Sequence, residues 1–304
     1  MTQQFANATD FRKSLEMRLK NHCAAQPRQL QRLQRNIAFE RFLARVVSDA
    51  AQPSNFLLKG GYAMELRIAH ARATIDVDLT CRLEPKDLQQ RLAEVVRSDL
   101  QRLASVDLKD FFVFEVGEAK LELDGPPYGG VRYPVTTMLA QRLWIRFQLD
   151  VGVDVVATPP DKLSGRGWLE FCGIPSPVFT AIALEQQVAE KIHAYTLPRL
   201  GGQNTRVKDL VDLVLLIRMK TLSPELLNKT LAAVFRVRKS HPIPSELPLP
   251  PQDWQMPFAN LANECGLAST LAEAFSEVNE LYIAVRNSVE RQGQNAGETE
   301  TVVC

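Results

Sequence analysis

The sequence has few of the features that would tie a chain to a membrane, to a disulfide framework or to a familiar nucleotide-binding loop. No apolar run reaches the roughly 18 residues that a membrane-spanning helix needs, and the polar first residues carry no signal-type segment. The cysteines lie at 23, 81, 172, 265 and 304 without a Cys-x-x-Cys pair, a scatter typical of reduced thiols in a cytosol. No Gly-x-Ser-x-Gly, Walker or dinucleotide loop is present. We therefore expect a cytoplasmic protein with no membrane contact.

The bulk composition is that of a globular chain. With 304 residues and 45% hydrophobic content, the chain is long enough for two domains and too apolar to be disordered. A net charge of +1 gives no overall attraction to nucleic acid. Residues 1–50, however, hold nine Lys and Arg against four acids. This local excess is either an electrostatic footprint for RNA or a solvated helix face, and both interpretations stay open.

One stretch organises the rest of the chain. A short apolar run leads into Gly60-Gly61 and a helical pattern, and residues 72–79 then resemble a strand that carries Asp76 and Asp78. Because alternate strand residues share a face, both carboxylates point away from the core, roughly 6–7 Å apart. Such a pair can hold Mg²⁺, while a glycine pair at a helix start lets backbone N–H groups approach a phosphate. The stretch therefore predicts a site for a metal-bound triphosphate. The other interpretation is an exposed pair of aspartates at a sheet edge.

The first half of the chain has a mixed helical and strand pattern. We expect helices over 9–25, 27–49 and 86–103 and further strands over 111–116, 120–123, 131–139 and 142–156. In the last strand, strict alternation places Trp144, Arg146 and Asp150 on one polar face. Asp150 therefore lies on a polar face late in this strand; alternatively, it belongs to a strand-end turn.

The second half has the periodicity of a helical domain. We expect helices over 180–196, 205–218, 223–239, 256–265 and 268–289, with a proline-rich extended arm over 241–251. The expected domains are 1–175 and 176–290, followed by a disordered tail over 291–304.

Three motifs in this order resemble a known family. Lys59-Gly-Gly followed by Arg72-x-Thr74-x-Asp76-x-Asp78, then Leu184-Glu-x-x-Val-Ala-Glu-Lys191, then Arg206-Val-Lys-Asp209-Leu-Val-Asp212, are similar to motifs of the AbiEii/AbiGii toxin family. That family belongs to the DNA polymerase β-like nucleotidyltransferase superfamily. The resemblance covers roughly residues 30–285. One departure is Gly60-Gly61, which stands where the wider superfamily often has Gly-Ser.

The resemblance implies a fold and an activity. The fold is α+β, a nucleotidyltransferase domain with a mixed sheet followed by a helical domain. The activity is Mg²⁺- or Mn²⁺-dependent transfer of NMP from an NTP to an acceptor, in some members the 3′ end of tRNA, which inhibits translation and growth. A cognate antitoxin, AbiEi-like or kinase-like, is an expected partner.

The resemblance also assigns roles to residues. The implied catalytic residues are Asp76, Asp78, Lys191 and Asp209, and the nucleotide-binding residues are Lys59, Gly60, Gly61, Arg72 and Thr74. The implied metal ligands are Asp76, Asp78 and a third carboxylate from a neighbouring strand, for which Asp150 is the first candidate and Asp154 the second. In relatives the Thr74 position can also be a phosphorylation target.

The residues themselves allow other readings. From its position beside an apolar helix ridge, Lys191 either snorkels to water or meets an anion. Asp209 lies in a first helical turn, where the dipole alone favours it, and Asp212 is expected to support helix packing. His193 is expected to be structural.

Two other functions remain open. The acceptor could be a small molecule or a protein hydroxyl, because acceptor identity depends on loops that the sequence does not explain. Alternatively, the chain could be a non-catalytic nucleotide- or RNA-binding module that keeps the fold.

Overall fold

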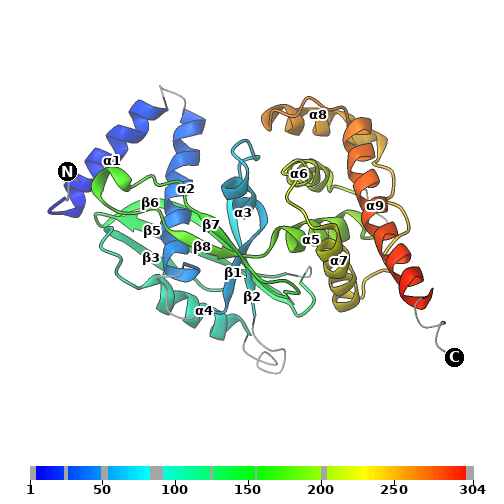
Figure 1. Ribbon diagram of the computed structural model, residues 1–304. Helices are drawn as coiled ribbons and strands as arrows, with labels where there is room; N and C mark the ends of the chain where they lie inside the picture. The colour runs from blue at the N-terminus through cyan, green and yellow to red at the C-terminus, as the bar shows by residue number, and fades with distance from the viewer. Residues whose placement is uncertain are drawn as a thin grey trace. The chain divides into compact units, whose positions relative to one another are not determined.

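The computed structural model describes residues 5–23, 27–48, 54–82, 92–123, 126–154, 156–199 and 204–298 (Figure 1). The chain divides into two compact units. Unit 1 comprises residues 1–67, 73–154 and 160–181, and unit 2 comprises 68–72, 155–159 and 182–304. The main change of unit thus follows residue 181, and two short segments of unit 2 interrupt unit 1. A composition shift along the chain cannot reveal such an interruption, because the segments are only a few residues long.

Unit 1 contains a mixed sheet. The described residues form eight strands, β1 Phe56–Lys59, β2 Asp76–Cys81, β3 Phe112–Val116, β4 Leu121–Glu122, β5 Gly130–Leu139, β6 Arg142–Val153, β7 Asp161–Ser164 and β8 Val178–Ala181. Their order is β3-β5-β6-β2-β1-β8-β7, and β4 pairs with β5. The β2–β6 and β1–β8 pairs are parallel, and the other pairs are antiparallel. This arrangement confirms the expected α+β class with a mixed sheet.

The helices of unit 1 are α1 Ala8–His22, α2 Pro27–Val46, α3 Gly60–Arg67 and α4 Leu92–Ala104, with a short 3₁₀ turn at Glu170–Cys172. Aromatic side chains of α2 pack edge-on against the sheet: the rings of Phe39 and Phe42 lie 4.9 and 5.6 Å from that of Phe147 on β6. Phe147, Leu149 and Val151 therefore face α2, and the residues between them face the other side of the sheet. The core between α2 and the sheet fixes which face of β6 is left for polar chemistry.

Several boundaries differ from the expectation. β2 begins at Asp76 and not at 72, and Val178–Ala181 is a strand and not the first turn of a helix. Asn7, not Asp10, caps α1, since its side chain accepts from the backbone N–H of Asp10 at 2.9 Å. The expected start of α4 at 86 lies outside the described residues.

Strict alternation fails in one place on β6. The pairing of β5 with β6 shifts register between Thr137 and Met138, which pair with Ile145 and Leu143 and leave Trp144 as an extra residue. Trp144 is buried, and its ring N–H donates to the carbonyl oxygen of Gln34 at 3.0 Å. Trp144 therefore does not share the polar face of the strand, as alternation predicted.

The basic excess of residues 1–50 is partly structural. Several of its arginines bind groups of unit 1 itself, namely Arg12, Arg32, Arg35, Arg41 and Arg45. Arg12, for example, donates to the carbonyl oxygen of Leu139 at 2.9 Å. These arginines join α1 and α2 to the rest of unit 1. This structural role differs from both interpretations of the basic excess, the RNA footprint and the solvated helix face.

Unit 2 is helical, with α5 Leu184–Thr196, α6 Val207–Ile217, α7 Pro224–Arg238, a 3₁₀ turn at Gln252–Trp254, α8 Gln255–Glu264 and α9 Leu271–Glu298. The proline-rich segment has no helix or strand over 241–251. Hydroxyl groups of buried tyrosines hold it: Tyr195 donates to the carbonyl oxygen of Pro248 at 2.8 Å and Tyr282 to that of Pro244. The proline-rich arm is thus fastened to the helices.

The C-terminal helix is longer than expected. α9 continues to Glu298, whereas the sequence pattern placed its end at 289 and a disordered tail from 291. The last part of that expected tail, 299–304, lies outside the described residues. Among the described helices, none combines the length and the apolar character that crossing a bilayer demands.

Candidate active site

Four charged side chains form a row across neighbouring strands of unit 1. The strand register places Lys59 of β1 opposite Asp78 of β2, Asp78 opposite Asp150 of β6, and Asp150 opposite Arg132 of β5. Directly opposed residues share one face of a sheet, and this is the face turned away from α2. We call Lys59, Asp78, Asp150 and Arg132 the charged row. Asp76, two residues before Asp78, lies on the same face.

Asp78 lies at the centre of this charge. Burial raises its pKa to about 6; repulsion from Asp76 and Asp150 adds to the rise, while Lys59 and a backbone hydrogen bond from Gly61 oppose it. The partly buried carboxylate of Asp78 is thus held next to other negative charge, which is the electrostatic condition that favours binding a cation.

The glycine pair has a steric reason in the structure. Gly60 has φ +67°, a left-handed conformation that favours glycine, and a Cβ there would overlap the carboxylate of Asp78. A Cβ on Gly61 would lie 2.6 Å from the hydroxyl oxygen of Thr74. Both glycines therefore let β1 and the start of α3 approach the segment that carries the aspartates. The phosphate role of their N–H groups stays a prediction.

Asp76 is held by the residue two positions before it. Thr74 donates its hydroxyl hydrogen to Oδ1 of Asp76 at 2.7 Å. The backbone of Thr74 is fixed in turn: its N–H donates to Glu65 at 2.6 Å and its carbonyl oxygen accepts from Arg35 at 2.8 Å. Thr74 is only 4% exposed, so modification of its hydroxyl would require this segment to open locally.

Arg132 is the residue that sequence reasoning missed. Its Nε and Nη2 donate to the two oxygens of Asp150, both at 2.6 Å, in the parallel geometry typical of a guanidinium–carboxylate pair. The available signal was its position among partly buried alternate residues of β5, but only the register with β6 reveals its partner. Asp154, the second candidate for the third carboxylate, lies beyond the end of β6 and outside the row.

The carboxylates suit a hard divalent cation by their chemistry. No group of three or more His, Cys, Asp or Glu side chains within the described residues is arranged to hold a metal ion. Mg²⁺, however, is usually bound by one or two carboxylates together with substrate phosphates, and not by an all-protein cage. Asp76 and Asp78 supply that oxygen set on one face, and the pKa of Asp78 is raised first by burial and then by the negative charge of Asp76 and Asp150. These residues fit a cation that arrives with a phosphorylated substrate.

Unit 2 has a separate cluster of charges. Nζ of Lys191 on α5 donates to Asp209 at 3.1 Å and to Asp212 at 2.6 Å, both on α6. Burial alone would lower the pKa of Lys191, but the carboxylates of Asp212 and Asp209 outweigh it and raise the pKa. Lys191 is therefore neither snorkelling nor free: it is a buried ammonium with two carboxylate partners.

Arg72 completes this cluster. It lies in the short segment 68–72 of unit 2, and its Nε and Nη2 donate to the two oxygens of Asp212 at 3.0 and 2.9 Å. Asp212 is fully buried, and although burial would raise its pKa, Lys191 and Arg72 lower it. Asp212, which was expected to support helix packing, is the central carboxylate of the ion cluster and joins α6 to α5 through Lys191. The guanidinium of Arg72 already uses two of its donors there.

His193 behaves as a structural residue. It is 4% exposed, Nε2 is 2.8 Å from Oγ of Ser240, and its ring lies 4.9 Å from that of Phe235. Burial lowers its pKa to about 3, and the nearby charge of Arg238 adds to this shift.

Comparisons with known proteins agree with the motifs. The family model described as the nucleotidyl transferase AbiEii toxin of type IV toxin–antitoxin systems matches residues 41–279. Since this match covers most of the sequence, the chain belongs to the AbiEii family of nucleotidyltransferase toxins. The family resemblance seen in the three motifs is thereby confirmed. No curated protein sequence matches the chain.

Solved structures of other proteins resemble this chain only distantly. The nucleotidyltransferase toxin MenT4 of Mycobacterium tuberculosis is 15% identical, with a TM-score of 0.49, over 71% of this chain and 68% of that one. JHP933 of Helicobacter pylori is 14% identical, with a TM-score of 0.46, over 89% of this chain and 98% of that one.

Proposed function

We propose that the chain is a toxin that transfers NMP from an NTP to the 3′ end of tRNA in the cytoplasm, and so arrests translation and growth. Membership of the AbiEii family supports nucleotidyl transfer. The observation that carries the site is the charged row, in which the aspartate that opposes Lys59 also opposes a second aspartate, Asp150.

Each residue of the row has a proposed role. Asp76 and Asp78, with Asp150, would hold the Mg²⁺ or Mn²⁺ of the nucleotide. When bound, that ion supplies positive charge to the phosphate oxygens at the reacting centre. Asp150 accepts the proton of the attacking hydroxyl, and Arg132 orients Asp150 for this. Lys59, at the other end of the row, contacts the triphosphate together with the N–H groups at Gly60-Gly61.

Unit 2 has a proposed contribution as well. Lys191 supplies positive charge to the triphosphate, and Asp209 orients its ammonium group. The two hydrogen bonds of Lys191 support this role, because they keep the group protonated and in one place. Arg72 fixes Asp212, and its positive charge is proposed to attract a phosphate of the nucleotide.

Transfer of labelled NTP tests the proposal. The protein is incubated with each of the four α-³²P-labelled NTPs, total tRNA, and Mg²⁺ or Mn²⁺, and the RNA is separated on a gel. We expect label on tRNA with the wild type and none with Asp76→Asn or Asp78→Asn. The matched control is Asp99→Asn, which removes a partly exposed carboxylate of α4 paired with Arg102, and it should label as the wild type does.

The same experiment separates the alternatives. Label on protein or on a small molecule, with unlabelled tRNA, would keep the enzyme and overturn the acceptor. No transfer to any acceptor, with NTP binding that is independent of metal by calorimetry, would favour the non-catalytic module. A cognate antitoxin is expected, and it should restore growth to cells that are arrested by the wild type.

A further inference from the structure

A cavity in unit 1 is independent of the charged row. Its volume is about 930 Å³, and it lies where the start of α1, the C-terminal half of α2 and the segment 172–178 meet. None of the residues of the charged row lines it. The volume is within the range that binding sites for small molecules usually have.

The walls are mostly apolar, and one buried cation lies among them. Side chains such as Phe5, Phe11, Phe111 and Ile174 line the cavity together with Arg41. Arg41 is only 4% exposed. The other charged groups that line it, Asp107 and Lys109, are exposed and pair with each other. Arg41 is therefore the charge that defines the site.

Arg41 shares its carboxylate with another arginine. Its Nε donates to Oδ2 of Asp110 at 2.7 Å, and Arg45 donates to both oxygens of the same carboxylate at 2.9 and 2.7 Å. Asp110 is fully buried, and although burial would raise its pKa, the hydrogen bonds and charges of Arg45 and Arg41 lower it. Two buried guanidinium groups thus have one buried carboxylate between them.

A further carboxylate lies near Arg41 but serves other groups. Glu40 interacts electrostatically with Arg41, yet one of its oxygens accepts the backbone N–H of Arg166 at 2.8 Å. Burial raises the pKa of Glu40, and the hydrogen bonds from Arg166 and Gly167 oppose that shift. Glu40 forms no ion pair with Arg41 in the described structure.

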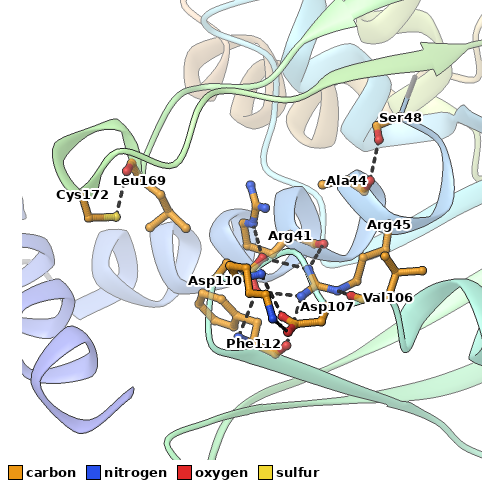
Figure 2. A network of polar contacts seen from close by, with 11 residues as sticks. Arg41, Ala44, Arg45, Ser48, Val106, Asp107, Asp110, Phe112, Leu169 and Cys172 are labelled. Carbon is orange, nitrogen blue, oxygen red and sulfur yellow. Dashed lines mark hydrogen bonds and ion pairs between the residues drawn. The ribbon is translucent and has the colours of Figure 1, made fainter. Parts of the chain in front are cut away.

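The terminal nitrogens of Arg41 have donors to spare. Neither Nη1 nor Nη2 donates to any group in the described part of the chain, where Nε supplies its side-chain hydrogen bond. Figure 2 shows Nε on the side of Asp110 and the terminal nitrogens pointing away from it. The thiol of Cys172 already donates to the carbonyl oxygen of Leu169 at 2.9 Å. Two parallel donors and one positive charge are thus left for a ligand.

We propose that this cavity binds an apolar small molecule that carries one carboxylate, and that the carboxylate pairs with Nη1 and Nη2 of Arg41. The planar edge of a guanidinium matches a carboxylate in a bidentate pair. A single cation among apolar walls suits an anion of one charge, whereas a phosphate of two charges would lack a second cation. The apolar walls accommodate the body of the ligand, whose burial adds favourable free energy.

Decanoate is a suitable probe, and decanol is its uncharged counterpart. Binding of each to the full-length protein is measured by calorimetry below the concentration at which decanoate forms micelles. We expect decanoate to bind and Arg41→Met to weaken it at least tenfold, with little effect on decanol. Arg102→Met, which removes a half-exposed arginine of α4, is the matched control and should bind decanoate as the wild type does.

A second readout keeps the proposal testable if Arg41→Met does not fold. Arg41→Lys keeps the charge but has no planar pair of donors, and it should bind decanoate more weakly than the wild type. Decanoate should also shift the ¹⁵N resonance of Arg41 Nε. Failure of decanoate to bind, equal binding by the Arg41 variants and the wild type, or an unmoved Arg41 resonance would overturn the proposal. None of these results depends on nucleotidyl transfer.

Discussion

Thr74 donates its hydroxyl hydrogen to Oδ1 of Asp76 over 2.7 Å, and Thr74 itself is almost fully buried. The hydrogen bond fixes one oxygen of Asp76 and leaves the other for a cation. We predict that Thr74→Val, which keeps the shape of the side chain and removes the donor, lowers the rate of nucleotidyl transfer by roughly 10- to 100-fold, as the loss of groups that orient metal ligands usually does. Initial rates of labelled transfer measure this.

The control for this position is Thr74→Ser, which keeps the hydroxyl and should keep most of the rate. Equal rates for Thr74→Val and the wild type, at matched folding by circular dichroism, would show that the hydrogen bond does not orient Asp76 for catalysis.

Asp78→Asn should separate activity from stability. In the ligand-free protein the folded-state pKa of Asp78 is raised to about 6, so its ionisation is unfavourable to the fold. The contribution of protonated Asp78 to the free energy of unfolding is complete below the unfolded-state pKa of about 3.9, and it is lost as the pH rises through about 6. At pH 7.5 we therefore expect Asp78→Asn to unfold at the same or a higher urea concentration than the wild type.

Activity should change in the opposite direction. Removing a carboxylate that holds the nucleotide's cation should cost several kcal/mol of transition-state stabilisation, which is on the order of 100-fold or more in rate. Urea unfolding and labelled transfer are measured on the same preparation. A variant that is both inactive and clearly less stable at pH 7.5 would contradict the proposed repulsion around Asp78.

Arg132→Gln tests the residue that the sequence did not reveal. The side chain of Arg132 is 35% exposed, so its loss should change the free energy of unfolding by no more than about 1 kcal/mol. If Arg132 orients Asp150, kcat should fall roughly tenfold or more while KM for NTP changes little. Arg132→Lys, which has no fork of donors, should recover only part of the rate. A large rise of KM with unchanged kcat would instead assign Arg132 to nucleotide binding.

In the ion cluster of unit 2, Asp212→Asn and Asp209→Asn should lower the free energy of unfolding by different amounts. Asp212 is fully buried between Lys191 and Arg72, whereas the side chain of Asp209 is 12% exposed and contacts Lys191 alone among buried cations. Asp212→Asn leaves two mostly buried cations with less compensation, and breaking a buried ion pair typically costs on the order of 3–5 kcal/mol. Asp209→Asn should cost clearly less. Urea unfolding at pH 7 compares the two, and an equal loss of stability would show that Asp212 is not the central partner.

The sequence was sufficient to place Asp76 and Asp78 on one face of a strand, because that signal is local. Asp76 and Asp78 share a strand face by a period that can be read directly, and the glycine pair marks a close approach whatever lies opposite. The strands of the first half and the helices of the second half followed from the same periodicities, whereas the mixed sheet was implied by the family resemblance; all are present in the structure. Local patterns were sufficient for the type of these elements but not for all of their ends, as the start of β2 and the end of α9 show.

Long-range pairings could not be predicted in this way. Arg132 is joined to Asp150, and Arg72 to Asp212 at a separation of 140 residues, and no property of either residue names its partner. The sequence did not predict that Trp144 is an extra residue of β6 either, because a register shift arises from the pairing of two strands and not from the alternation within one strand. The role of Arg41 and Arg45 beside Asp110 has the same origin: the sequence showed their charge, and the fold supplied the carboxylate.

His193 gives a prediction of acid sensitivity. Burial lowers its folded-state pKa to about 3, and the charged groups around it are Arg238, Glu190 and His241. The unfolded chain binds a proton to this histidine near its ordinary pKa of about 6.5, while the folded chain stays neutral there. The contribution of neutral His193 to the free energy of unfolding is therefore complete above about pH 6.5, and it is lost as the pH falls from there towards about 3. In His193→Gln this loss should be absent, so its free energy of unfolding should fall less between pH 7 and pH 4.5 than that of the wild type. Urea unfolding at half-unit steps of pH measures both slopes, and identical slopes would mean that His193 is not neutral in the folded protein.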